Sequence, residues 1–200
     1  EGKVIHPQHW PEKLDYKNVL PIINNAKLQA PSVCNALDTI LIHEKQLNNL
    51  LPKIVSELNK NGVQTRLDSK LYQSIKNADS IKLIRKANDK DWGKEFLDLI
   101  VSIKSVKSVD DAINHIDEYS FGHTDGIISN INKNINTFVQ KVNSSAVTVN
   151  ASTRFNDGGE IGLGSEIAIS TTKVSPRGPL GLEEITTYKW LIKGKGHTRG

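Results

Sequence analysis

Two kinds of hydrophobic pattern alternate along this chain. Short apolar runs predict strands buried on both faces, and apolar residues that recur every three or four positions predict helices that bury one side. The clearest strand is predicted over 39–42. The clearest helix is predicted over 44–60, with Asn61-Gly62 as its stop signal and one apolar face made of Leu47, Leu50, Leu51, Ile54, Val55 and Leu58.

The same patterns predict further elements on both sides of this pair. Helices are expected at 16–28, 69–76, 109–119 and 131–142, and strands at 63–67, 81–84, 97–104, 127–129 and 146–150. Asp15 can cap the first helix, which contains Pro21, and Ser108 with Asp111 resembles a capping box for the helix that begins at 109. Strands that alternate with helices predict an α/β fold around a parallel sheet.

The two ends of the chain do not follow this alternation. Segment 1–14 contains Pro7 and Pro11 and has no periodicity, so it is predicted to be an extended lead-in. Segment 151–181 is rich in glycine and proline and is expected to be a long functional loop. A dinucleotide-binding glycine motif is not expected at Gly162-Leu163-Gly164, because Ile167 stands where the third glycine belongs. Residues 185–192 form a final β-prone run.

Composition bounds the class of protein. The 200 residues, with 37% hydrophobic and 24% charged residues, fit one soluble globular domain with a real core. No run is long enough to span a membrane, and the amino end lacks the features of a signal peptide. The net charge of +4 is dispersed and only 6% of residues are aromatic, so nucleic acid is not an expected partner. One cysteine excludes an internal disulfide and suits the cytoplasm.

Cys34 is the main candidate for chemistry. It lies at the predicted bend between a helix and a strand, where a thiol is exposed on one side and fixed on the other, as a nucleophile requires. The competing interpretation is a small buried apolar residue, which is the commonest role of a lone cysteine. His6 and His9 have no further ligand at a closing spacing, so no metal site is predicted.

Five motifs in the same order carry a resemblance to a known family. They are residues 25–36 together with 39–43, then Phe121-Gly122-His123-Thr124-Asp125, then residues 149–159, then 162–171, and finally Arg177-Gly178-Pro179 with Gly181-Leu182. In this order they resemble γ-glutamyl phosphate reductase, a branch of the aldehyde dehydrogenase superfamily. The resemblance begins near Asp15 and covers the carboxy-terminal half of such an enzyme.

The resemblance implies a function and a set of site residues. It implies NADP(H)-dependent reduction of γ-glutamyl phosphate to glutamate 5-semialdehyde in proline biosynthesis, through a thioester on Cys34. It places Glu95 at the nicotinamide ribose, although the aromatic residue after it is shifted by one position. The implied substrate-binding residues are Ser32, Asn35, Asn150, Ser152, Thr153 and Arg154. Ala30 stands where many relatives carry a basic residue, which removes one expected anion contact.

The resemblance also implies an organisation and partners. Residues 1–183 correspond to a parallel-sheet catalytic domain of aldehyde dehydrogenase type, and 184–200 correspond to a terminal strand that acts as an oligomerisation arm. The cofactor-binding half has no counterpart in these residues, so the chain alone is expected to be inactive. A homo-oligomer and an association with glutamate 5-kinase are further expectations.

Two alternatives remain open from the sequence. One is a non-catalytic α/β module that serves interaction or dimerisation. The other is a cysteine hydrolase in which His43 or His123 acts as the base, which requires an imidazole within hydrogen-bonding reach of the sulfur.

Overall fold

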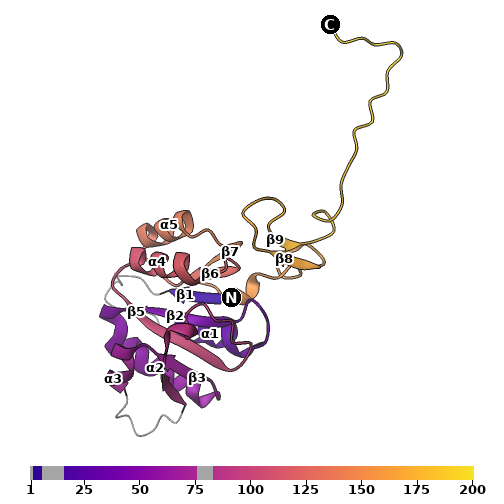
Figure 1. Cartoon of the computed structure of the whole chain (residues 1–200). Helices are drawn as coiled ribbons and strands as arrows, with labels where there is room; N and C mark the ends of the chain where they lie inside the picture. The colour runs from indigo at the N-terminus through magenta and orange to yellow at the C-terminus, as the bar shows by residue number, and fades with distance from the viewer. Residues whose placement is uncertain (1, 6–15, 76–82) are drawn as a thin grey trace.

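The chain forms three layers, a parallel sheet between two layers of helices, in a computed structural model that describes residues 2–5, 16–75 and 83–200 (Figure 1). The predicted parallel α/β fold is confirmed. The candidate ligands His6 and His9 and the candidate cap Asp15 lie outside the described residues.

Within the described residues, seven strands make the main sheet in the order β4-β3-β5-β2-β1-β6-β7, and every neighbouring pair is parallel. Their bounds are β1 Gly2–Ile5, β2 Leu37–His43, β3 Gln64–Leu67, β4 Ile84–Lys86, β5 Ile100–Val106, β6 Thr124–Ile127 and β7 Ala146–Val149. The central strand β2 is buried along its whole length. It therefore reads as an apolar run rather than as an alternation.

Helices cover both faces of the sheet (Figure 1). The helices α1 (Tyr16–Leu28), α2 (Leu47–Lys60) and α3 (Ser69–Ile75) share one apolar core with the sheet, and α4 (Val109–Tyr119) and α5 (Asn132–Lys141) share a second core on the other face. The predicted bounds of α1 and α4 are confirmed, and the Ser108 side chain caps α4 by accepting from the Asp111 N–H at 3.0 Å. The first three residues of the helix predicted at 44–60 instead form a short 3-10 turn, Glu44–Gln46.

Several strand predictions were displaced or missing. The strand predicted at 97–104 lies at 100–106, and the one predicted at 127–129 lies at 124–127. Both strands were predicted over the most apolar residues of their segments. In β6 this choice excluded Thr124 and Asp125, which are polar residues buried inside the sheet. The extended lead-in was wrong for 2–5, because β1 lies between β2 and β6 in the middle of the sheet.

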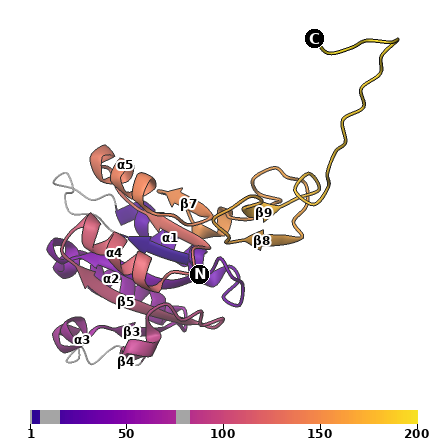
Figure 2. The same ribbon diagram turned by 45° about the horizontal axis from the view of Figure 1, so that its top comes forward.

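The carboxy-terminal segment leaves the three layers. The predicted loop at 151–181 contains a short 3-10 turn, η3 (Thr153–Phe155), and an antiparallel hairpin of β8 (Ala168–Ser170) and β9 (Gly178–Leu180). Residues 185–192, the predicted β-prone run, form no strand within this chain and extend away from the body, so their pairing with another subunit stays a prediction (Figure 2). Among the described residues, no helix has the length and apolar character needed to cross a membrane.

Candidate functional site

Cys34 lies in the loop that joins α1 to β2, at the edge where the strands begin. The residue is exposed, and the loop turns through a hydrogen bond from the Ala36 N–H to the Val33 carbonyl at 3.0 Å. The strands end at the opposite edge of the sheet. His43 and Asn150 lie at that opposite edge, because each directly ends or follows a strand, whereas Cys34 precedes one.

A buried ion pair closes the base of the Cys34 loop. Lys27, in the last turn of α1, places its Nζ 3.3 Å from Oδ1 of Asp38, near the start of β2, and both side chains are almost wholly buried. Burial lowers the pKa of Lys27 and raises the pKa of Asp38, and the charge of each partner opposes these shifts. The pair therefore fixes the two ends of the loop that presents the thiol.

Asp38 also holds the segment that carries Glu95. Its Oδ1 accepts a hydrogen bond from the Phe96 backbone N–H at 3.3 Å. Phe96 is buried, and the Arg66 guanidinium lies 5.0 Å from the centre of its ring, whereas Glu95 beside it is exposed. The Asp38 carboxylate thus links the Cys34 loop to the segment that carries the exposed Glu95.

Gly93 allows this segment to pack against α4. A Cβ atom there would lie 2.4 Å from the carbonyl oxygen of Tyr119, and the backbone has φ +71°. We expect Gly93→Ala to lower the free energy of unfolding by roughly 2–3 kcal/mol, from the left-handed backbone and the collision together. Urea denaturation measures this change in the free energy of unfolding. Gly62→Ala is the matched control, because Gly62 has φ +79° with open space around it; an equal loss in both variants would contradict the role of the collision.

After β7 the chain folds back toward the thiol edge. The Asn150 N–H donates to the carbonyl of Ile127 at the end of β6, and six residues later the Asn156 amide donates to Oγ1 of Thr124 at the start of β6, at 2.7 Å. Segment 150–156 therefore runs back along the sheet and brings η3 beside α1 and the Cys34 loop.

Asn35 joins this returning segment to the Cys34 loop. Its carbonyl accepts from Thr153 Oγ1 at 2.7 Å, and its amide donates to the carbonyl of Asn156 at 3.0 Å. The Arg154 guanidinium donates to Asn35 Oδ1, while the Ser152 hydroxyl caps η3 by accepting from the Arg154 N–H at 3.3 Å. The buried Asn35, Ser152 and Thr153 thus shape the loop, and they place Arg154 beside it.

The predicted site residues fall into two groups. Ser32, which is exposed, shares the Cys34 loop, and Asn35, Ser152, Thr153 and Arg154 converge on it. Asn150 does not join them. Its side chain donates to the carbonyl of Ser129 at 2.8 Å and accepts from the Ser129 N–H at 2.7 Å, across the ends of β6 and β7.

Two cavities lie near these groups. A cavity of about 330 Å³ at the carboxyl ends of the strands is lined by Asn150 and by Asn18, Val19, Pro21, Ile22, Ile128 and Asn130, with no charged side chain among them. A smaller cavity of about 140 Å³ is lined by Asn25, Gln29, Arg154, Phe155, Asp157 and Glu160. The second lies at the thiol edge and carries charge, so it is the stronger candidate for the site.

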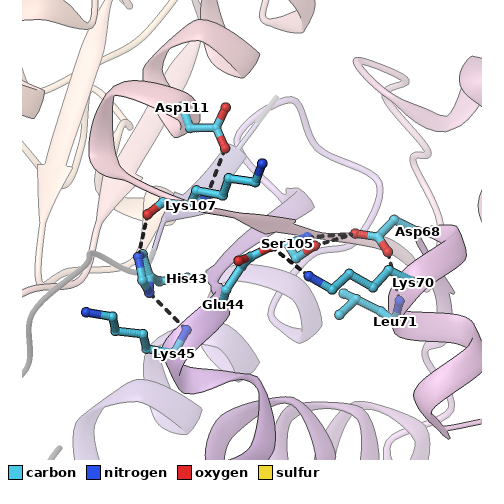
Figure 3. A network of polar contacts seen from close by, with 9 residues as sticks. All are labelled: His43, Glu44, Lys45, Asp68, Lys70, Leu71, Ser105, Lys107 and Asp111. Carbon is cyan, nitrogen blue, oxygen red and sulfur yellow. Dashed lines mark hydrogen bonds and ion pairs between the residues drawn. The ribbon is translucent and has the colours of Figure 1, made fainter.

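Neither histidine suits the role of a base for Cys34. His43 lies at the far end of β2, a strand of 7 residues that spans roughly 20 Å. Its Nε2 donates to the Lys107 carbonyl at 2.6 Å and its Nδ1 accepts from the Lys45 N–H at 3.1 Å (Figure 3). His123 lies at the thiol edge, but burial lowers its pKa to about 4, which makes it a weak base at neutral pH.

Polar side chains at the opposite edge of the sheet satisfy one another. Asp68 accepts from the backbone N–H groups of Leu71 and Ser105, both at 2.8 Å, and Lys70 pairs with Glu44 at 2.7 Å (Figure 3). A structural network therefore occupies the carboxyl ends of β2, β3 and β5. Within the described ranges, no group of three histidine, cysteine or acidic side chains could hold a metal ion.

Sequence reasoning missed several residues of the thiol edge. Lys27 was read only as part of a motif, and Asp38, Asp157 and Glu160 were assigned no role. The available signal was the lysine on the buried face of α1 beside Ala26, since a buried lysine requires a nearby acid.

Comparisons with known proteins identify relatives of this chain. No protein-family model matches the chain. It is 46% identical over 186 residues to the γ-glutamyl phosphate reductase of Dehalococcoides mccartyi, which is 92% of this chain and 44% of that protein. It is 49% identical over 185 residues to that of Clostridium beijerinckii, which is 92% of this chain and 43% of the relative. The chain thus spans less than half the length of these relatives.

Solved structures give the same result. The crystal structure of γ-glutamyl phosphate reductase from Thermotoga maritima matches with a TM-score of 0.89 and 43% identity, over 100% of this chain and 46% of that chain. A propionaldehyde dehydrogenase from Clostridium phytofermentans shares the fold, with a TM-score of 0.61 and 17% identity over 90% of this chain and 47% of that one. By sequence and by fold, the chain is a homologue of about one half of γ-glutamyl phosphate reductase, with an aldehyde dehydrogenase-type fold.

Proposed function

We propose that this chain is the carboxy-terminal catalytic part of an enzyme that reduces γ-glutamyl phosphate to glutamate 5-semialdehyde in proline biosynthesis. The observation that carries the proposal is the exposed Cys34 on a loop whose ends are fixed by the buried Lys27–Asp38 pair. The identity of 43–49% to γ-glutamyl phosphate reductases supports the choice of substrate.

The chemistry assigned to Cys34 is nucleophilic. Its thiolate attacks the acyl carbon of the phosphate anhydride, the C–O bond to phosphate breaks, and phosphate leaves with the electron pair. A thioester to Sγ remains. After hydride delivery to that carbon, the resulting thiohemiacetal loses the sulfur as thiolate and releases the aldehyde. A thiolate suits both steps, since it is a good nucleophile and a good leaving group.

Cys34 and its neighbours would also stabilise charge during these steps. The backbone N–H of Cys34 and amide groups of its loop are the candidate donors to the developing oxyanion. Ser32 is exposed on the same loop and can contact the phosphate. The buried Asn35, Ser152 and Thr153 would then contribute indirectly, because they hold the loop and Arg154 in place.

The nicotinamide cofactor NADP(H), when bound, supplies the hydride. The exposed Glu95, on a segment fixed to Asp38 through Phe96, fits a contact to one ribose of this cofactor. Among the described residues no glycine-rich turn leads into a helix that could receive the phosphates; Gly162 and Gly164 lie in a loop. We therefore assign the remaining contacts to the half that this chain does not contain.

The carboxy-terminal arm, residues 184–200, carries exposed aromatic and aliphatic side chains. Tyr188, Trp190 and Ile192 are 78%, 84% and 92% exposed on a segment that pairs with no strand of the described chain. We propose that this arm packs against a partner subunit in a homo-oligomer. The cytoplasm as location and glutamate 5-kinase as partner remain predictions from the resemblance.

Reconstitution tests the function. The chain is fused to the remaining half of the Thermotoga maritima reductase, and the reverse reaction, phosphate-dependent reduction of NADP⁺ by glutamate 5-semialdehyde, is followed by absorbance. We expect turnover that depends on both phosphate and aldehyde. The control is the Thermotoga protein cut and rejoined at the same junction. An active control beside a folded but inactive fusion would contradict the proposal.

A further inference from the structure

A charged cavity lies beside the loop that carries the thiol. Its lining comes from the end of α1, through Asn25 and Gln29, and from the segment after η3, through Asp157 and Glu160, with Arg154 between them. Arg154 bonds to Asn35, the residue directly after Cys34. A ligand in this cavity would therefore lie next to the thiol loop.

Arg154 is positioned as a cation without a counter-ion. Its Nε donates to Gln29 Oε1 at 3.1 Å and its Nη1 donates to Asn35 Oδ1, so both acceptors are neutral amide oxygens. Within the described ranges it forms no ion pair. Two bonds fix the plane of the guanidinium and leave its Nη2 for a ligand. A guanidinium held in this way is prepared for a carboxylate.

Two carboxylates line the same cavity and do not neutralise this cation. Asp157 is fixed by its Oδ1, which accepts from the N–H groups of Gly159 at 2.9 Å and Glu160 at 3.2 Å. Glu160 is exposed and forms no ion pair in the part of the chain that the structure describes. The cavity thus separates one positive charge from two negative charges.

We propose that this cavity binds the α-amino-acid head group of the substrate, with the α-carboxylate on Arg154 and the α-ammonium on Asp157 and Glu160. The inference rests on the proposed function and adds the recognition of a zwitterion to it. The volume of about 140 Å³ equals that of four to five water molecules at about 30 Å³ each, which is room for a head group. The γ-carboxyl end then remains for Cys34, beside Asn35.

The charges make the recognition testable with simple ligands. The probes are L-glutamate, which carries both head-group charges, and glutarate, which lacks the ammonium, each titrated at millimolar concentration into the isotope-labelled chain and followed by NMR. We expect L-glutamate to shift the resonances of Arg154, Asp157 and Glu160 and to bind more tightly than glutarate.

Two variants test the acidic and the basic side chains of the cavity separately. Glu160→Gln removes one contact to the ammonium, so L-glutamate should bind roughly tenfold more weakly while glutarate is unaffected. Arg154→Gln should weaken both ligands. Glu183→Gln and Arg177→Gln are the matched controls, because Glu183 is exposed, Arg177 is half-buried against Asn143, and both lie outside the cavity; neither should change the binding of either ligand.

Three results would overturn the inference: no shift at the cavity residues, equal affinity for L-glutamate and glutarate, or an equal loss for both ligands in Glu160→Gln. The measurement does not depend on turnover. An inactive fusion whose chain still prefers L-glutamate would contradict the proposed reduction and support this site. An active fusion whose chain shows no preference for L-glutamate would support the proposed reduction and contradict this site.

Discussion

Cys34→Ser is expected to lower turnover of the fused enzyme by more than roughly a thousandfold. A serine hydroxyl is a weak nucleophile without an adjacent base, and its ester accepts hydride less readily than a thioester. Neither His43 nor His123 can compensate, since the first lies at the opposite edge and the second has its pKa lowered to about 4. The rate of NADP⁺ reduction in the presence of aldehyde and phosphate measures the effect.

The loss of turnover in Cys34→Ser must come from the missing thiol and not from a less stable fold. Because Cys34 is exposed, the serine variant should unfold at the same denaturant concentration as the parent chain and should bind L-glutamate equally well. If Cys34→Ser retained turnover, the thioester mechanism would be contradicted, even if the fold were unchanged.

Asp38→Asn is expected to lower the free energy of unfolding by about 3–5 kcal/mol. The substitution leaves the Lys27 ammonium buried without its partner, and removing one member of a buried ion pair has costs of this size. It also weakens the bond that Phe96 donates to the carboxylate. Urea denaturation at neutral pH gives the free energy from the transition midpoint and slope.

The exposed pair of Lys141 and Asp110, at 2.6 Å, provides the matched control. Asp110→Asn should cost at most about 1 kcal/mol, because exposed ion pairs contribute little. The double variant Lys27→Met with Asp38→Asn should recover much of the loss, since no charge is then buried. A small effect of Asp38→Asn, comparable with that of Asp110→Asn, would mean that the buried pair does not hold the loop.

Local signals predicted the elements that depend on local interactions. α4 begins directly after Ser108, whose side chain caps it, so its start could be read directly from the sequence. β1 could not be recognised, because four residues carry too little periodicity and its place is decided by pairing with β2 and β6. The β8–β9 hairpin could not be recognised either, because its strands are also too short to show periodicity and lie in a segment dominated by glycine and turn residues.

The motifs named several residues that lie together in the structure, but they did not give the arrangement of those residues. The motifs named Asn35, Thr153 and Arg154, which the structure brings together around the Cys34 loop. The motifs also grouped Asn150 with these residues, but it lies at the opposite edge of the sheet, because a motif does not say where the chain goes after a strand ends. The role of Asp38 depends on a lysine in the last turn of α1 and on the backbone N–H of Phe96 in a distant segment, and no sequence spacing reveals these contacts.

The exposed arm supplies its own reporter of assembly. Trp190 is 84% exposed and lies with Tyr188 in an edge-to-face contact at 5.7 Å, away from the three layers. An indole in water emits at longer wavelength than one covered by protein. If a second copy packs over this arm, the tryptophan emission will move to the blue as the protein is concentrated, and the position of that transition will give the strength of the association without any added label.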